Sequence, residues 1–119
     1  MTNINNVFGN ALTGRVAIYV PGTAGPVAED SALADRVTAD VAGRLSELFG
    51  GATISLAAGA WMSQEHGLIR EQVQIVYSYC TTEQLEQNAG AVRAIAEHVK
   101  NTMEQEAVSV EINNALYFI

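Results

Sequence analysis

Hydrophobic residues alternate with polar or small ones in three stretches of this chain, a period typical of half-buried β-strands. These stretches cover residues 15–20, 52–58 and 69–79. Two shorter candidates, 107–112 and 115–119, flank Asn113 and Asn114, which tolerate the positive φ of a hairpin turn. The alternation assigns one face of these strands to the core, with Val16, Ile18, Ile54, Leu56, Val73, Ile75, Val110 and Ile112.

Two longer stretches have the period of amphipathic helices. Between residues 30 and 48, apolar side chains recur at spacings of four, four, four and three, at Leu33, Val37, Val41, Leu45 and Leu48. The second helix begins at Thr81, because Thr81 and Gln84 have the spacing of a capping box. Residues 21–26, with two prolines and two glycines, are predicted to form a loop.

The order of these elements predicts the fold class. It is β-α-β-β-α-β followed by one hairpin strand, which is typical of an α+β fold of the ferredoxin-like, split β-α-β type. Such a fold is an antiparallel sheet with two helices on one face. The 119 residues form a single predicted domain, 1–119, in which residues 1–13 are an arm that is flexible or contacts another subunit.

The other face of the predicted sheet carries small and polar side chains and two arginines, Arg15 and Arg70. Small side chains allow a second sheet or a flat ligand to approach closely. We therefore expect an oligomer interface or a ligand-binding floor there, with a solvated face as the alternative. Gly59 is expected to form a bulge that redirects Trp61, which would be either a core lid or a stacking platform.

The composition limits the partners. A net charge of −7, from 13 acidic and 6 basic residues, disfavours binding to nucleic-acid backbones and to anionic membranes. The N-terminus lacks the basic and apolar regions of a signal peptide, so a cytoplasmic protein is expected. Cys80 is the one cysteine, which excludes an internal disulfide and a cysteine-rich zinc site. We predict neither a metal nor a cofactor.

Catalytic signatures are weak. Gly22 to Gly25 lacks the GK[ST] ending of a phosphate-binding loop. Three residues have suitable chemistry for an enzyme, His66, Glu71 and Glu111, but nothing in the sequence brings them together. Alternation places Glu71 on the helix-facing side, where a structural ion pair is expected. No catalytic residue is predicted.

A ligand site is predicted instead at Arg15, Arg70 and Trp61. The two arginines are the cationic residues on strands, and a guanidinium can hold a phosphate or carboxylate with two hydrogen bonds. Trp61 supplies a ring for stacking. The alternative is that both arginines pair with Glu111 and neighbouring acids.

Several short motifs resemble those of a family of small uncharacterised proteins from bacteria, phages and other mobile elements. These motifs are Phe49 to Thr53, Gly59-x-Trp61, Gly67 to Glu71, and the closing segments Gln105 to Val108 and Leu116 to Ile119. A more distant resemblance is to a ferredoxin-like domain of unknown function. The resemblance implies the same order of elements and a mobile-element setting, and it brings no active site.

Together these features favour a non-catalytic, homo-oligomeric binding protein. It would act as a phage or mobile-element accessory factor that binds a protein partner or sequesters a small, anionic or aromatic, nucleotide-like ligand in host-defence inhibition. The alternative is a small ferredoxin-like dimeric enzyme of the isomerase or cofactor-free oxygenase type.

Overall fold

The computed structural model of the chain describes residues 3–24 and 28–119. In chain order its elements are α1 (Ile4–Phe8), β1 (Gly14–Pro21), β2 (Thr23–Ala24), β3 (Ala28–Glu29), α2 (Ser31–Phe49), β4 (Thr53–Ser63), β5 (Gly67–Cys80), α3 (Thr82–Thr102), β6 (Ser109–Ile112) and β7 (Ala115–Phe118). Five strands form one sheet in the order β4-β5-β1-β6-β7, in which all neighbours are antiparallel. The prediction of an α+β fold with an antiparallel sheet is thereby confirmed.

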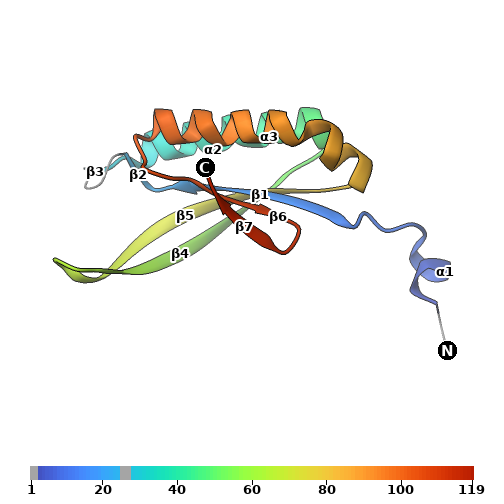
Figure 1. The fold of residues 1–119 in the computed structure, drawn as a ribbon, viewed down its shortest axis with the longest axis horizontal. Helices are drawn as coiled ribbons and strands as arrows, with labels where there is room; N and C mark the ends of the chain where they lie inside the picture. The colour runs from blue at the N-terminus through green and yellow to red at the C-terminus, as the bar shows by residue number, and fades with distance from the viewer. Residues whose placement is uncertain (1–2, 25–27) are drawn as a thin grey trace.

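The two long helices lie side by side on one face of the sheet (Figure 1). α2 begins where the Asp30 side chain accepts a hydrogen bond from the Leu33 backbone N–H, at 3.0 Å, and it ends at Gly50, which adopts a left-handed φ of 94°. α3 begins with the predicted capping box, in which Thr81 and Gln84 exchange hydrogen bonds. We call the sheet face that points away from both helices the open face.

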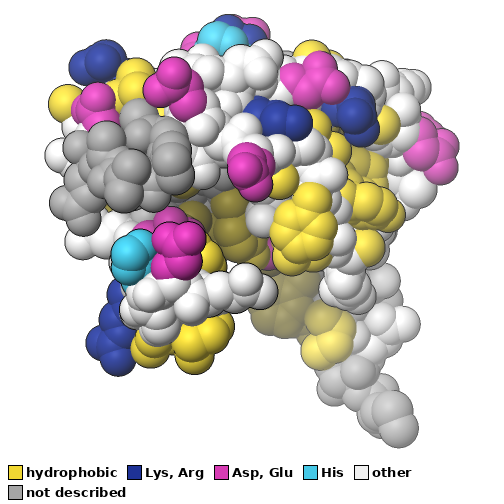
Figure 2. All heavy atoms as spheres, turned by 60° about the vertical axis from the view of Figure 1, so that its left-hand side comes forward, with side chains coloured by type: hydrophobic (Ala, Val, Ile, Leu, Met, Phe, Trp, Pro, Cys, Tyr) yellow, Lys and Arg dark blue, Asp and Glu magenta, His cyan; other side chains and the backbone are white. Residues whose placement is uncertain are grey.

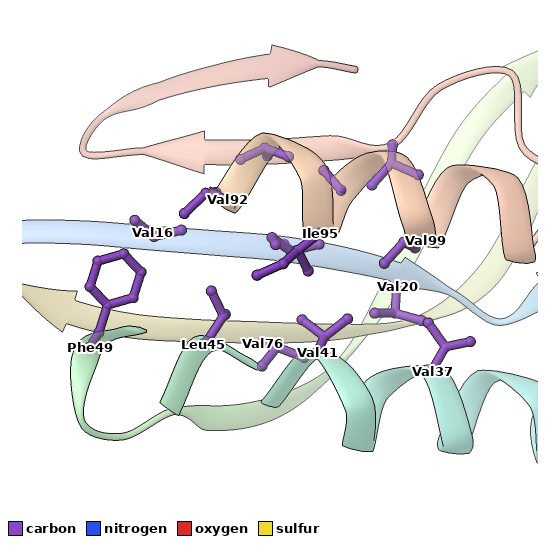
Figure 3. Close-up of a cluster of buried hydrophobic side chains, with 14 of the residues drawn as sticks. Val16, Val20, Val37, Val41, Leu45, Phe49, Val76, Val92, Ile95 and Val99 are labelled. Carbon is purple, nitrogen blue, oxygen red and sulfur yellow. The ribbon is translucent and has the colours of Figure 1, made fainter. Parts of the chain in front are cut away.

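The core lies between the helices and the sheet, where α2 and α3 interleave their apolar side chains with those of β1 and β5 (Figure 3). Val16, Ile18 and Val110 are buried there as predicted, and Ile112 packs against them. From the helices, Val37, Val41, Leu45, Val92, Ile95 and Val99 complete the layer.

The predicted assignment of faces on β5 is wrong. Ile18, which faces the helices, pairs with Val76, whereas Tyr19 on the open face pairs with Ile75. Val76 is therefore the buried core residue, and both Val73 and Ile75 lie on the open face. The helix-facing side can contain Ser78 because its hydroxyl donates a 2.6 Å hydrogen bond to the Gly51 carbonyl.

The β4–β5 hairpin also departs from the prediction. Its register runs without interruption through the pair Gly59 and Glu71, so no bulge forms at Gly59. The hairpin extends past the helix layer (Figure 1). Ile54 and Leu56, which were predicted to lie in the core, are 47% and 81% exposed, because they lie on β4, the edge strand of the sheet.

The N-terminal arm stands apart from the sheet. α1 lies beyond the end of β1 and away from the helix layer (Figure 1). Residues 3–13 are exposed throughout. No helix in the described residues has both the length and the apolar character needed to cross a membrane.

Candidate functional site

A shallow pocket of about 410 Å³ lies on the open face, where the β4–β5 hairpin passes beside β1. We call it the hairpin pocket. Seen from the hairpin end, hydrophobic surface is exposed in the hollow between the hairpin and the rest of the molecule (Figure 2). The pocket is lined by small residues with one carboxylate and two aromatic rings, namely Tyr19, Ala57, Ala58, Gly59, Ala60, Trp61, Glu71, Val73 and Ile75.

Glu71 is the charged residue of the hairpin pocket. Strand alternation on β5 brings it to the same face as Ile75, which corrects the prediction that it faces the helices. It is half-buried, and no hydrogen bond or ion pair to another described residue occupies its carboxylate. A partly buried carboxylate without a cation beside it is available to bind a positively charged ligand or to accept a proton.

Gly59 gives this carboxylate its room. It pairs with Glu71 across the hairpin. A Cβ atom at this position would approach the Glu71 Cγ to 3.3 Å and the Val73 Cγ2 to 3.4 Å, closer than most such contacts. Glycine therefore lets the Glu71 side chain lie across β4, toward the pocket.

Tyr19 forms part of the pocket wall and belongs to a hydrogen-bonded network along β1. Its hydroxyl donates a hydrogen bond to Glu111 Oε1, and Arg15 Nε lies 3.9 Å from Glu111 Oε2. The hydrogen bond to Glu111 raises the pKa of Tyr19, burial and the Glu111 charge raise it further, and the Arg15 charge lowers it. The Tyr19 hydroxyl is thus held protonated, as a donor to Glu111, at neutral pH.

Arg15 is already engaged by its neighbours. Its guanidinium lies 4.2 Å from the centre of the Tyr77 ring and 5.7 Å from that of Tyr79, and one of its nitrogens lies 3.5 Å from the Tyr79 hydroxyl. With Glu111 beside it, Arg15 is held within the sheet surface.

A second pocket, of about 420 Å³, lies at the other end of the hairpin, where α2 passes into β4. We call it the arm-base pocket because Leu12, at the base of the N-terminal arm, forms part of its rim. Its lining carries no charged side chain and consists of Leu12, Phe49, Gly50, Gly51, Ala52, Thr53, Tyr77, Ser78 and Tyr79.

The three residues of the predicted ligand site are not brought together on one face. Trp61 lines the hairpin pocket, and Arg15 lies on the open face at the other end of β1. Arg70 points to the opposite side of the hairpin, since it precedes Glu71 on β5. The binding roles of these three residues stay predictions. The prediction that Arg15 and Arg70 both lie on the open face is wrong, because only Arg15 lies there.

The structure also separates the weaker catalytic candidates. His66 is exposed at the hairpin turn, 3.7 Å from its neighbour Glu65. Glu71 and Glu111 share the open face with Tyr19, which the sequence did not single out. Burial raises the pKa of the Cys80 thiol and keeps it protonated, in line with an inert cysteine. The described residues contain no cluster of metal-ligating side chains.

The molecule thus belongs to the α+β class, and its residues 3–24 and 28–119 contain a five-stranded antiparallel sheet and three helices. Solved structures that share this fold include two of a phage enzyme. One is a phage SAM lyase in complex with S-methyl-5'-thioadenosine, with a TM-score of 0.64 and 21% identity over 92% of this chain and 91% of that one. The other is a phage SAM lyase in the apo state, with a TM-score of 0.65 and 22% identity over 89% and 87% of the two chains. No family model and no curated protein matches the chain.

These similarities contradict the prediction of a non-catalytic, ligand-sequestering binding protein, because the two solved structures named above are those of a lyase. The same finding contradicts the expectation that the chain is more likely not an enzyme. The three acid–base candidates are not adjacent in the sequence, and the face of β5 that carries Glu71 was assigned incorrectly. The alternative, a small enzyme, agrees better with the comparison, although a lyase is neither an isomerase nor an oxygenase.

Proposed function

We propose that this protein is a lyase that cleaves S-adenosylmethionine (SAM) and releases S-methyl-5'-thioadenosine. The observation that carries the proposal is the fold shared with phage SAM lyases over nearly the full length of both chains, including one in complex with that thioadenosine. The hairpin pocket supports it, because its volume of about 410 Å³ is within the usual range for small-molecule sites.

The charge distribution of SAM fits the hairpin pocket. SAM carries a permanently cationic sulfonium between its adenosine and its amino-acid chain. The Glu71 carboxylate is the negative group of the pocket and would attract that cation, while Trp61 offers a ring face for adenine. The net charge of −7 favours the approach of such a cationic substrate.

The reaction needs neither water nor an oxidant. The bond between sulfur and the carbon chain of the amino acid breaks, and its electron pair returns to sulfur, which becomes the neutral thioether of the thioadenosine. The carbon chain either loses a proton to form a double bond or closes on its own carboxylate to form a ring. Glu71 orients the sulfonium for both routes and accepts the proton in the first.

We also propose the finer features expected from the sequence. The split β-α-β, ferredoxin-like topology is supported by the strand order β4-β5-β1-β6. A homo-oligomer is supported by exposed hydrophobic side chains on the open face, of which Trp61 is 51%, Leu116 48% and Phe118 71% exposed. A cytoplasmic location and a phage or mobile-element origin complete the proposal.

The test is a direct assay of the purified protein with SAM. Mass spectrometry should detect S-methyl-5'-thioadenosine, and in ¹⁸O-labelled water the four-carbon product released by the enzyme should carry no label if water takes no part. Glu71→Gln should lower kcat/KM by about 100-fold or more. Glu65→Gln, an exposed carboxylate at the hairpin turn, is the matched control and should leave the rate unchanged. If the thioadenosine does not exceed the level formed by heat-inactivated protein, the proposal fails.

A further inference from the structure

The N-terminal arm is an apolar element without a partner in its own chain. In α1 the hydrophobic residues Ile4, Val7 and Phe8 share one helix face, and they are 64%, 61% and 80% exposed. Leu12, which follows in the extended part of the arm, is 54% exposed. From residue 3 to residue 13 the arm carries no charge, although the whole chain has a net charge of −7.

The ends of α1 are well defined. The Asn3 side chain accepts a 2.9 Å hydrogen bond from the Asn5 N–H, and the Gly9 N–H donates to the Asn5 carbonyl at 2.9 Å. Gly9 closes the helix with a φ of 79°. A helix of five residues is nevertheless too short to be stable in water by its own hydrogen bonds. Its exposed apolar face therefore requires a surface to pack against.

The arm-base pocket has the matching chemistry. It carries no charged side chain, and Phe49, Tyr77 and Tyr79 are among its lining residues. Its volume of about 420 Å³ accommodates an aromatic side chain together with a smaller neighbour. An uncharged arm and an uncharged pocket meet without the desolvation of charge that docking on the acidic remainder of the surface would require.

The arm's direction argues against its own pocket as the docking site. β1 begins at Gly14, where a Cβ atom would lie 2.9 Å from both the carbonyl oxygen and the Sγ of Cys80, so the backbone there is tightly held. The Arg15 N–H is fixed to the Asn113 side chain at 3.0 Å. From this anchored start the arm leads away from the sheet (Figure 1), and its own Leu12 already lies at the rim of the pocket.

We propose that the arm of one copy docks on a second copy of this chain, with Phe8 inserted into the neighbour's arm-base pocket. The arm offers four large apolar side chains, which bury too little surface to hold an oligomer alone, since stable interfaces bury on the order of 1,200 Å² or more. Docking of the arm therefore stabilises an interface between two copies to which the open face also contributes. This inference is independent of any catalytic activity.

Disulfide trapping tests the contact directly. Phe8→Cys is placed in a chain with one affinity tag and Thr53→Cys, in the pocket lining, in a chain with another tag, and the two are co-expressed and oxidised. A covalent dimer carrying both tags is expected. Native Cys80 is fully buried, and the wild-type protein treated in the same way controls for it. Phe8→Cys combined with Gln64→Cys, at the distant hairpin turn, should give no such dimer.

Two outcomes of disulfide trapping overturn the proposal. One is the absence of the two-tag dimer. The other is a chain carrying both Phe8→Cys and Thr53→Cys that forms its disulfide only within itself, which would mean that the arm folds back. In addition, Phe8→Ser should raise the dissociation constant of the oligomer by about tenfold or more in analytical ultracentrifugation. Asn6→Ser, on the polar side of α1, is the matched control, and equal dissociation constants for the two variants contradict the proposal as well.

Discussion

At the scale of single residues, the open face depends on groups that hold one another in place. Tyr19 lines the hairpin pocket and donates its hydroxyl to Glu111, which also lies beside Arg15. Arg15 in turn lies over the ring of Tyr77. These contacts fix the wall of the pocket next to Glu71 without using the Glu71 carboxylate, which leaves that group for a ligand.

The raised pKa of Tyr19 gives this network a pH dependence. Because the folded protein holds the phenol proton more tightly than the unfolded chain does, the resulting stability is fully present below the ordinary tyrosine pKa of about 10. It is lost as the pH rises above that value through the raised pKa of the folded state. We expect the free energy of unfolding of the wild type to fall more steeply above about pH 10 than that of Tyr19→Phe.

Denaturant melts at several pH values measure this difference. Tyr117→Phe, at an exposed tyrosine on β7, is the control and should retain the slope of the wild type. Parallel curves for the wild type and Tyr19→Phe would show that the hydrogen bond to Glu111 does not stabilise the folded state.

At the scale of elements, the sequence predicts the order of the two long helices and of the five strands of the large sheet. It predicts neither the short elements α1, β2 and β3 nor the faces of β5. Both sides of this strand carry apolar residues, with Val76 on one side and Val73 and Ile75 on the other, so period two alone does not identify the core. The buried side includes Ser78, whose partner is the Gly51 carbonyl, a contact that exists only in the folded chain. The choice of which alternate residues of β5 face the helices also determines the candidate site. It places Glu71 in the hairpin pocket and Arg70 on the opposite side of the hairpin.

Paired substitutions on β5 test this assignment. Val76 is fully buried under the helices, so Val76→Ala should lower the free energy of unfolding by about 2 kcal/mol, from the lost methyl groups and the cavity they leave. Ile75→Ala removes more carbon atoms but from the half-buried open face, and in the monomer it should cost less. Urea melts at a concentration below that of oligomer formation compare the two. A larger loss for Ile75→Ala would mean that the open face is the core of the monomer.

At the scale of the whole molecule, the chain is acidic, but the hairpin pocket lies on the open face, which carries little charge. The open face contains the hairpin pocket with Glu71 and the Arg15–Glu111 pair, while other ion pairs, such as Asp40 with Arg44 at 3.0 Å, lie on the helices. The sequence gives the sign of the long-range field directly. That field repels nucleic acid and attracts a cationic metabolite. The net charge of −7 therefore disfavours nucleic acid as a partner and favours the proposed cationic substrate.

The field predicts how salt affects substrate and product. SAM has a net positive charge at neutral pH, whereas S-methyl-5'-thioadenosine is neutral, and both occupy the same proposed pocket. Raising the ionic strength from about 0.01 M to about 0.15 M shortens the screening length from roughly 30 Å to roughly 8 Å. The KM for SAM should therefore rise about two- to fivefold, while the inhibition constant of the thioadenosine should change by less than about 1.5-fold. Steady-state kinetics with the thioadenosine as inhibitor gives both values in one series. If the two constants shift in parallel, salt acts on the fold or the assembly, and the negative charge of the chain does not guide the substrate.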